Sequence, residues 1–341
     1  MPCYVGLDAS KKTTSICVMD PKGAVLREGE VETTPTAIIG FLRGGRLRYA
    51  RLGIEASPMS NWLAGNLTRA RLRTICIEAR HAHGVLRAQS NKTDASDARG
   101  IADLMRTGVY RAVHVKSEYS RQVRALLSAR KLLNAKAADI RNGVRAFLLE
   151  LGLKLPRGKT SQFDTAVGSF LKKHPFASSL VAPLLTLHKT LLAQAKIFED
   201  RVVQIARDDP ACQLFTTIPG VGWLTALSYR ALVDDPMRFA HSRSVGPHLG
   251  LVPRTFQSGE SEWRGKITKR GDKEARCALC LAARTLLNRR TRQTWLKTWG
   301  EQLTARRSRM CAVIAVARRL AVIMHRMWIT QTSFRLEGCL A

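Results

Sequence analysis

Hydrophobic and polar residues recur in short runs over the first part of the chain. Runs that alternate or are rich in β-branched residues predict strands, and apolar residues three to four positions apart predict helices. The strands are expected at 4–8, 14–19, 25–33, 51–55 and 74–77, and the helices at 36–42 and 58–70. Strands interleaved with helices are typical of an α/β sheet covered by helices.

Downstream of these segments the pattern becomes helical. A helix expected at 94–107 carries apolar residues on one face, namely Ala98, Ile101, Ala102 and Met105. Longer helices are expected at 120–151 and 183–207, with irregular residues around 156–160 between them. Such a pair predicts either an antiparallel, coiled-coil arm or two core helices of one domain, and the pattern leaves both interpretations open.

A third region begins near residue 209 and differs in composition. An apolar helix is expected at 224–232, and a helix is expected after Asp272. Between them, residues 253–271 are rich in Gly, Ser, Lys and Arg and have no helical period, which predicts an exposed loop or hairpin.

Charge and composition narrow the class of protein. The 341 residues carry 56 Lys and Arg against 26 Asp and Glu, a net charge of +30, and 18 of the basic residues lie within 254–326 against five acids. A hydrophobic fraction of 45% excludes a disordered basic tail, and the length suggests about two domains. Such a surplus favours a nucleic-acid partner. A membrane is disfavoured, because no long apolar run exists and mean hydropathy is −0.12.

The cysteines and the N-terminus indicate a cytoplasmic protein. The eight cysteines are scattered through mostly apolar stretches, as reduced, buried thiols are. Cys277 and Cys280 have the spacing of half a zinc site, but no second pair of ligands matches them. The N-terminal residues show no signal peptide.

Four acids stand out by their positions. Asp8 and Glu55 end expected strands, and Asp94 and Asp97 begin an expected helix. Strand ends share one edge of a sheet, and helix residues three apart point the same way. Carboxylates brought so close repel each other, and a divalent cation with oxygen ligands relieves the conflict. Two such ions about 4 Å apart serve phosphodiester chemistry.

Simpler interpretations of these acids remain open. Asp8 and Asp94 each suit a capping role, and Asp97 is an ordinary acid in the first turn of a helix. Glu55 is harder to explain structurally, because it ends an apolar strand. Together, in a chain expected to meet phosphates, the four acids favour a metal site.

The basic C-terminal region holds two candidate features. Gly220 and Gly222, in Ile-Pro-Gly-Val-Gly before a helix, suit a hairpin whose N–H groups hold a phosphate, or a simple turn. Ser258 and Ser261 flank a flexible Gly259, and either hydroxyl suits a nucleophile in a positive field or a plain loop. Five basic residues surround the serines as expected nucleic-acid contacts: Arg254, Arg264, Lys266, Lys269 and Arg270.

These segments, in this order, resemble the IS110 family of transposases. The resemblance rests on six linked motifs and spans almost the whole chain: GLDAS at 6–10, GIEAS at 53–57, KTDASDA at 92–98, IPGVG at 218–222, GLVPRTFQSGE at 250–260 and GKITKRGD at 265–272. It implies an α/β RuvC-like (RNase H-like) domain at 1–118, a helical coiled-coil segment at 119–208 that partly completes it, and a mainly α transposase domain at 209–341.

The resemblance also implies a mechanism. Asp8, Glu55, Asp94 and Asp97 match the family's DEDD acids, which bind Mg²⁺ (or Mn²⁺), and Ser258 matches its nucleophilic serine, leaving Ser261 a neighbour. The resemblance further implies a covalent 5′-phosphoserine intermediate and strand exchange between donor and target double-stranded DNA. The partners implied are a structured bridge RNA as guide and a homodimer that assembles into a tetramer, in which the acids of one protomer meet the serine of another. We expect a bacterial cytoplasmic protein associated with the nucleoid, without a membrane partner.

Two other classes of function remain alternatives on the residues alone. A RuvC-like nuclease or junction resolvase would use the four acids and a water nucleophile, with no role for the serine. A non-enzymatic nucleic-acid-binding protein would use the acids only as caps and surface charges.

Overall fold

The computed structural model describes residues 1–86, 93–156, 158, 160–259 and 261–337, except for the side chains of His81, Val85, Leu86, Glu262 and Arg264. The chain divides into two compact units, Met1–Ser117 and Glu118–Ala341.

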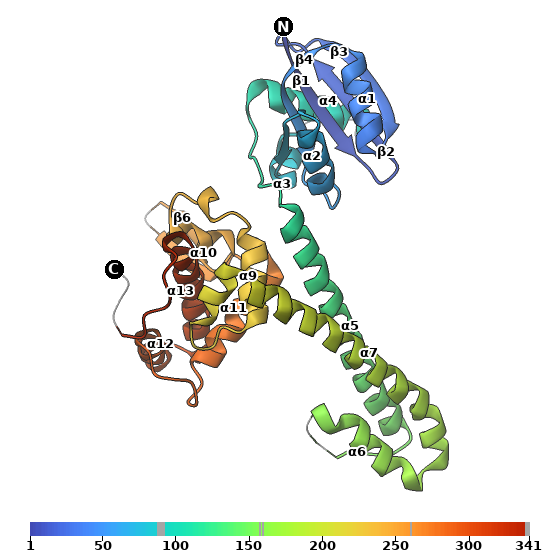
Figure 1. Cartoon of the computed structure of the whole chain (residues 1–341), viewed down its shortest axis with the longest axis vertical. Coiled ribbons are helices and arrows are strands. Elements are labelled where there is room, and N and C mark those ends of the chain that lie inside the picture. The colour runs from blue at the N-terminus through green and yellow to red at the C-terminus, as the bar shows by residue number, and fades with distance from the viewer. Residues whose placement is uncertain (87–92, 157, 159, 260, 338–341) are drawn as a thin grey trace. The chain divides into compact units, whose positions relative to one another are not determined.

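The first unit is built on a five-stranded mixed sheet (Figure 1). Its strands are β1 Pro2–Ala9, β2 Thr13–Met19, β3 Val25–Glu32, β4 Arg48–Glu55 and β5 Thr74–Ile77. They lie in the order β3-β2-β1-β4-β5. The first three form an antiparallel meander, whereas β4 pairs parallel with both β1 and β5. The carboxyl ends of β1, β4 and β5 therefore meet at one edge of the sheet.

Helices cover both faces of this sheet. They are α1 Pro35–Gly44, α2 Ser60–Arg69, α3 Ala79–Leu86 and α4 Asp94–Thr107. Buried residues of α1 and α2 pack with Val5, Leu7 and Ile54 in one cluster, while α4 packs on the opposite face beside Cys17 and Ile77. Alternate residues of each strand thus face different helices.

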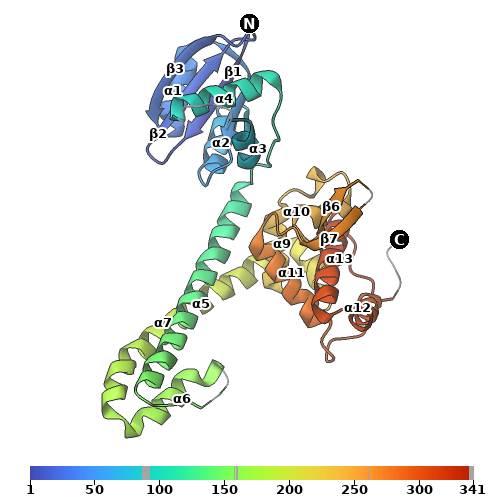
Figure 2. The ribbon, with the colours of Figure 1, turned by 180° about the vertical axis from the view of Figure 1, so that it is seen from behind.

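The second unit is helical apart from one hairpin. Its helices are α5 Glu118–Glu150, α6 Phe163–Phe170, α7 Pro175–Asp208, α8 Pro210–Thr216, α9 Trp223–Val233, α10 Val245–His248, α11 Lys273–Leu286, α12 Trp295–Arg306 and α13 Arg309–Thr330. Short 3₁₀ turns lie at Thr160–Gln162, Leu171–Lys173, Pro236–Arg238 and Ser242–Ser244. The hairpin strands are β6 Pro253–Ser258 and β7 Ser261–Ile267, which lie side by side (Figure 2).

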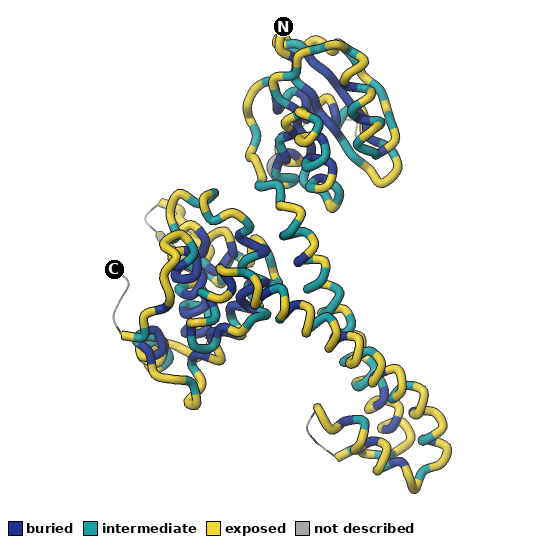
Figure 3. The backbone as a smooth tube through the Cα atoms, viewed as in Figure 1, coloured by how far each residue is buried: buried dark blue, intermediate teal, exposed yellow. Residues whose placement is uncertain are grey.

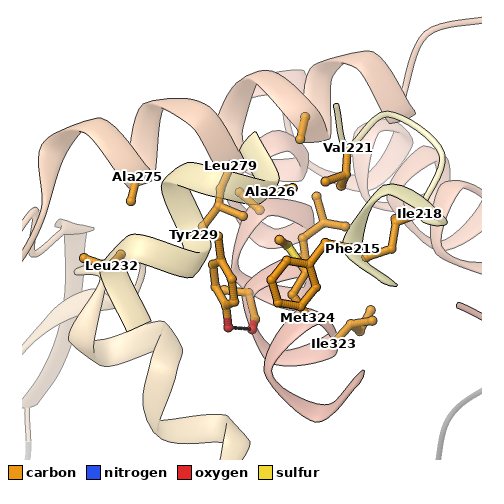
Figure 4. Close-up of a cluster of buried hydrophobic side chains, with 14 of the residues drawn as sticks. Phe215, Ile218, Val221, Ala226, Tyr229, Leu232, Ala275, Leu279, Ile323 and Met324 are labelled. Atoms are coloured by element: carbon orange, nitrogen blue, oxygen red, sulfur yellow. Dashed lines mark hydrogen bonds between the residues drawn. The ribbon is translucent and has the colours of Figure 1, made fainter. Parts of the chain in front are cut away.

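The main core of this unit joins α8, α9, α11 and α13 (Figure 4). Fully buried Tyr229 packs edge-on against Phe215 at 5.3 Å between ring centroids. Its hydroxyl donates a 2.6 Å hydrogen bond to the carbonyl oxygen of Ala321. This bond gives the one polar atom of the ring a partner, which a buried tyrosine requires.

Helices α5 and α7 pack along each other, and their surfaces are largely exposed or half-buried (Figure 3). At one end Val123 and Val202 join the main core, and at the other Val144 and Val181 form a separate core with α6. The interpretation as an antiparallel arm and the interpretation as core helices are therefore each partly right. By length and composition α7 also passes as a membrane-spanning helix, but a core helix passes the same test.

Most predicted elements are confirmed, with boundaries shifted by a few residues. The strands, the helix at 94–107 and the hairpin before Asp272 all form. The predicted start of the second long helix at 183 is wrong, because α7 begins at Pro175 and carries Pro183 inside it. The pattern also did not predict α3, α6, α8, α10, α12 and α13 as separate helices. The three-part layout with boundaries at 118 and 208 stays a prediction.

Candidate active site

Asp8 and Glu55 lie at the carboxyl ends of neighbouring parallel strands. The register pairs Gly6 with Gly53, so the residues two positions further along, Asp8 and Glu55, come side by side. Both are half-buried. Because residues two apart in a strand share a face, both side chains lie on the face that α4 covers. The fold thus directs two carboxylates to one edge and one face of the sheet.

Helix α4 runs antiparallel to β1 and β4, which brings its first turn to the same edge. Arg51, early in β4, donates from Nη1 to the carbonyl oxygen of Met105, late in α4, at 3.0 Å. Gly6, late in β1, faces the backbone of Ala98, early in α4. A helix oriented in this way presents its N-terminal turn to the carboxyl ends of the strands.

Asp94 and Asp97 occupy that first turn. The helix begins here because Thr93 and Ser96 form a capping box, in which each side chain accepts from the other residue's backbone N–H. Asp94 is exposed and Asp97 is half-buried. The structure therefore gathers the four predicted acids at one edge of the sheet.

The oxygen donors of these acids suit a hard cation such as Mg²⁺. Within the described part of the chain, however, no three Asp, Glu, His or Cys side chains come close enough to hold a metal ion. The donor set fits the ion in chemistry, and its side chains stand apart in this structure.

His83 of α3 adds a residue that the sequence pattern did not single out. Its Nε2 atom lies 3.5 Å from Oε1 of Glu55. A signal was available, because His83 follows β5 and the end of β5 lies beside Glu55 in the sheet register. His83 therefore lies within reach of one of the four predicted acids.

Arg99 ties the start of α4 to the sheet. Its Nε and Nη2 atoms bind the two carboxylate oxygens of Glu28 in β3 at 2.5 and 2.6 Å. The hydrogen bond from Arg99 holds the pKa of Glu28 below its ordinary value. Paired bonds of this kind fix orientation as well as distance, so the pair positions the turn that carries the two aspartates.

In the second unit, Ser258 ends β6 at the tip of the hairpin and is exposed. Gly259 follows with φ +57°, a left-handed conformation that suits a two-residue hairpin loop. Ser261 is paired with Ser258, and its hydroxyl donates a 3.0 Å hydrogen bond to the Ser258 carbonyl oxygen. Within the described residues, the Ser258 hydroxyl has no such bond.

Arg276 of α11 holds the base of the hairpin. Its Nη1 atom donates to the carbonyl oxygens of Leu249, Arg270 and Gly271 at 3.0–3.1 Å. Of the five basic residues expected near the serines, Arg254, Lys266, Lys269 and Arg270 are exposed. The side chain of Arg264 lies outside the described part of the structure.

The two glycines of the 218–222 motif differ in their surroundings. Gly220 has φ +91°, and a Cβ there would lie 2.9 Å from the carbonyl oxygen of Ala282 in α11. Packing against α11 therefore accounts for this glycine. Gly222 is exposed and caps α9 without a side-chain hydrogen bond, and a helix N-terminus of this kind suits an anion.

Comparison with known proteins identifies the family. A model of IS110-type DEDD transposases, described as Transposase, matches residues 5–152. A second, described as Transposase IS116/IS110/IS902 family, matches residues 212–299. Together the matches include both the strand-end acids and the hairpin with its serine.

Individual relatives agree with these matches. The transposase for insertion sequence element IS1111A of Coxiella burnetii is 29% identical in an alignment covering 97% of this chain and 91% of the relative. The transposase for element IS1328 of Yersinia enterocolitica is 31% identical over 72% of this chain and 73% of the relative. The DEDD match implies a RuvC-like fold for the mixed sheet of the first unit. The chain belongs to the IS110 family of insertion-sequence transposases and is an enzyme that recombines DNA.

Proposed function

We propose that this transposase cuts and rejoins donor and target DNA through a covalent intermediate on Ser258. The observation that carries the proposal is the hairpin tip, where the Ser258 hydroxyl is exposed while the Ser261 hydroxyl is bonded to a carbonyl oxygen. An exposed serine among basic residues suits attack on a phosphodiester, because the field stabilises the charge that develops on the phosphate.

The step balances as a transesterification. The Ser258 oxygen forms a bond to phosphorus, the bond from phosphorus to the 3′ oxygen breaks, and the DNA end is held as a 5′-phosphoserine. The serine loses one proton and the departing 3′ oxygen gains one. A 3′ hydroxyl from another strand reverses the step, so rejoining needs no external energy source.

Asp8, Glu55, Asp94 and Asp97 would hold Mg²⁺, or Mn²⁺, in the same reaction. Bound there, the ion would supply positive charge to the phosphate oxygens. The edge geometry supports this assignment, because it brings four carboxylates to one face in a chain of net charge +30. Without a cation, carboxylates drawn together around a phosphate would repel each other and the DNA backbone.

The exposed basic residues around the hairpin would bind backbone phosphates. The N-terminus of α9 at Gly222 would bind phosphates as well. The exposed residues are Arg254, Lys266, Lys269 and Arg270. We also propose Arg264 and Gly220 as phosphate contacts, on the sequence pattern alone. Binding of this kind releases counterions, so DNA affinity should fall steeply as salt rises.

We further infer that a structured bridge RNA guides the choice of DNA, as base pairing does in other RNA-guided systems. The protein would act in the bacterial cytoplasm at the nucleoid, as a homodimer that assembles into a tetramer. The acids and the serine lie in different compact units, which is compatible with active sites completed by two protomers. Sequencing the RNA that copurifies with the full chain tests the guide, and a discrete species encoded beside the gene is the expected result.

The covalent step is tested by trapping. Full-length protein with its copurified RNA and Mg²⁺ is incubated with a duplex spanning one end of the insertion sequence, and adducts are resolved by denaturing electrophoresis. Ser258→Ala should abolish the adduct, whereas the matched control Ser261→Ala should retain it. An adduct that survives Ser258→Ala would refute the assignment. Cleavage without any adduct would instead indicate a nuclease that uses water.

A further inference from the structure

The β6–β7 hairpin carries two large aromatic rings in the open. Phe256 is 51% and Trp263 is 63% exposed, and their ring centroids lie 5.0 Å apart with a tilt of 31°. The rings lean over Gly265, where an added Cβ would lie 3.2 Å from Trp263. The glycine thus leaves room for the rings to lie over the strand. Two large rings exposed side by side on a charged surface favour a binding role.

The register places this aromatic pair on the same face of the hairpin as Ser258. Phe256 is directly opposite Trp263, and Ser258 is directly opposite Ser261. Phe256 and Ser258 are two residues apart in one strand, so their side chains share a face and their Cα atoms are separated by about 7 Å. A phosphate at the Ser258 hydroxyl therefore brings its neighbouring nucleotides within reach of the rings.

The positive charge around the two rings indicates which kind of ligand binds there. Arg254 and Lys266 are exposed on the same two strands as the rings. Basic groups beside aromatic faces are the arrangement that proteins use for unpaired nucleotides, since the basic groups follow the backbone and the rings stack on the bases. An apolar protein partner has no need of these flanking cations.

We propose that Phe256 and Trp263 form a stacking platform for one DNA base next to the phosphate attacked by Ser258. This inference rests on the proposed function, because it takes Ser258 as the attacking group. The base leaves the helical stack and lies against the rings, which fixes the adjacent phosphate at the hairpin tip. Phe256 and Trp263 are positioning residues, and no covalent step passes through them.

The experiment measures DNA affinity in a Ser258→Ala background, so that no covalent bond forms. The probe is the duplex spanning one end of the insertion sequence, with the full chain and its copurified RNA. Nucleotides within two positions of the cleaved phosphate are replaced one at a time by an abasic analogue. Trp263→Ala should weaken binding of intact DNA by about 5- to 160-fold, the range expected for one stacked base.

At one of these positions, abasic DNA should bind Trp263→Ala and the Ser258→Ala parent with equal affinity, because the base that the ring holds is gone. Trp263→Phe should retain most of the affinity, which shows that loss in the alanine variant is not simple unfolding. The matched control is Thr255→Ala, on the opposite face of the hairpin, and it should bind like the parent.

Several outcomes would overturn the platform. One is an equal loss for Trp263→Ala on intact DNA and on every abasic DNA, and another is a Trp263→Phe variant as weak as the alanine variant. A third is a change in sedimentation of Trp263→Ala with no dependence on bases, which would assign the rings to a protein interface. If wild-type protein forms no Ser258-dependent adduct, the proposed function itself is refuted. That result is independent of the measurements on the platform.

Discussion

Gly6 of β1 lies directly against the backbone of Ala98 in α4. A Cβ at Gly6 would be 2.0 Å from the Ala98 carbonyl oxygen and 2.4 Å from the Ala102 nitrogen. The helix backbone cannot move by that amount locally, so any side chain at Gly6 must lift α4 off the sheet. This contact sets how closely α4, and with it Asp94 and Asp97, approaches β1.

The first prediction concerns this contact. Gly6→Ala should lower the free energy of unfolding by about 3 kcal/mol or more, at the upper end of overpacking effects. It should also abolish the Ser258 adduct, since it separates Asp94 and Asp97 from Asp8. Urea denaturation followed by circular dichroism measures the first effect. Gly40→Ala in α1 is the control, because nothing lies within 4 Å of the added atom and stability should not fall. A Gly6→Ala protein as stable as wild type would refute the tight approach.

A second prediction tests the ion pair between Glu28 and Arg99. Glu28→Gln removes the charge that holds Arg99, and the first turn of α4 gains freedom. We expect slower adduct formation with nearly unchanged DNA affinity, because Glu28 is far in sequence from the basic hairpin. Glu30→Gln, exposed on the same strand, is the matched control and should cleave like wild type. Equal rates for both variants would show that the pair has no positioning role.

The third prediction concerns Arg276 at the base of the hairpin. Arg276→Gln should destabilise the second unit by about 1–3 kcal/mol, the cost of leaving several carbonyl groups without a charged donor. Adduct formation should fall further than overall stability, because the hairpin tip loses its fixed position. Lys273→Gln on the exposed side of α11 serves as control. Equal stability and equal adduct formation in Arg276→Gln and Lys273→Gln would refute the role of Arg276 in positioning the hairpin.

The fourth prediction is a pH dependence that arises from His325. Burial lowers the pKa of this fully buried side chain. Its Nε2 atom donates to the Pro236 carbonyl oxygen and its Nδ1 atom accepts from the Ser242 hydroxyl, both at 2.9 Å. The unfolded chain therefore binds a proton more readily than the folded one. Stability should be complete above the unfolded pKa of about 6.5 and decline as pH falls through the lower folded value.

Urea denaturation between pH 8 and pH 5 measures this dependence. His325→Gln should be less stable at pH 8 and should show a smaller loss on acidification. The exposed His241→Gln variant should follow the wild-type curve. An unchanged pH slope in His325→Gln would assign the acid sensitivity to other groups.

Local patterns in the sequence were sufficient to predict most secondary structure. Thr93 and Ser96 cap α4 at the expected residue, and short runs rich in apolar and β-branched residues mark β1 and β2 as strands. The errors occurred where local signals conflict with packing. Pro183 suggested a helix start, yet it lies on an exposed side of α7, where its missing N–H bond costs least.

The sequence by itself determined the chemical inventory of this protein: a basic chain, four acids at element ends, a serine followed by a glycine, and a family resemblance. Only the tertiary structure decided which of these groups meet. The parallel register of β1 and β4 and the antiparallel course of α4 bring acids from three separate segments to one edge. Strand pairing in the hairpin leaves Ser258 exposed, engages Ser261 and places two rings on the same face. Such relations depend on register and on close backbone approach between distant segments, which local residue preferences do not specify.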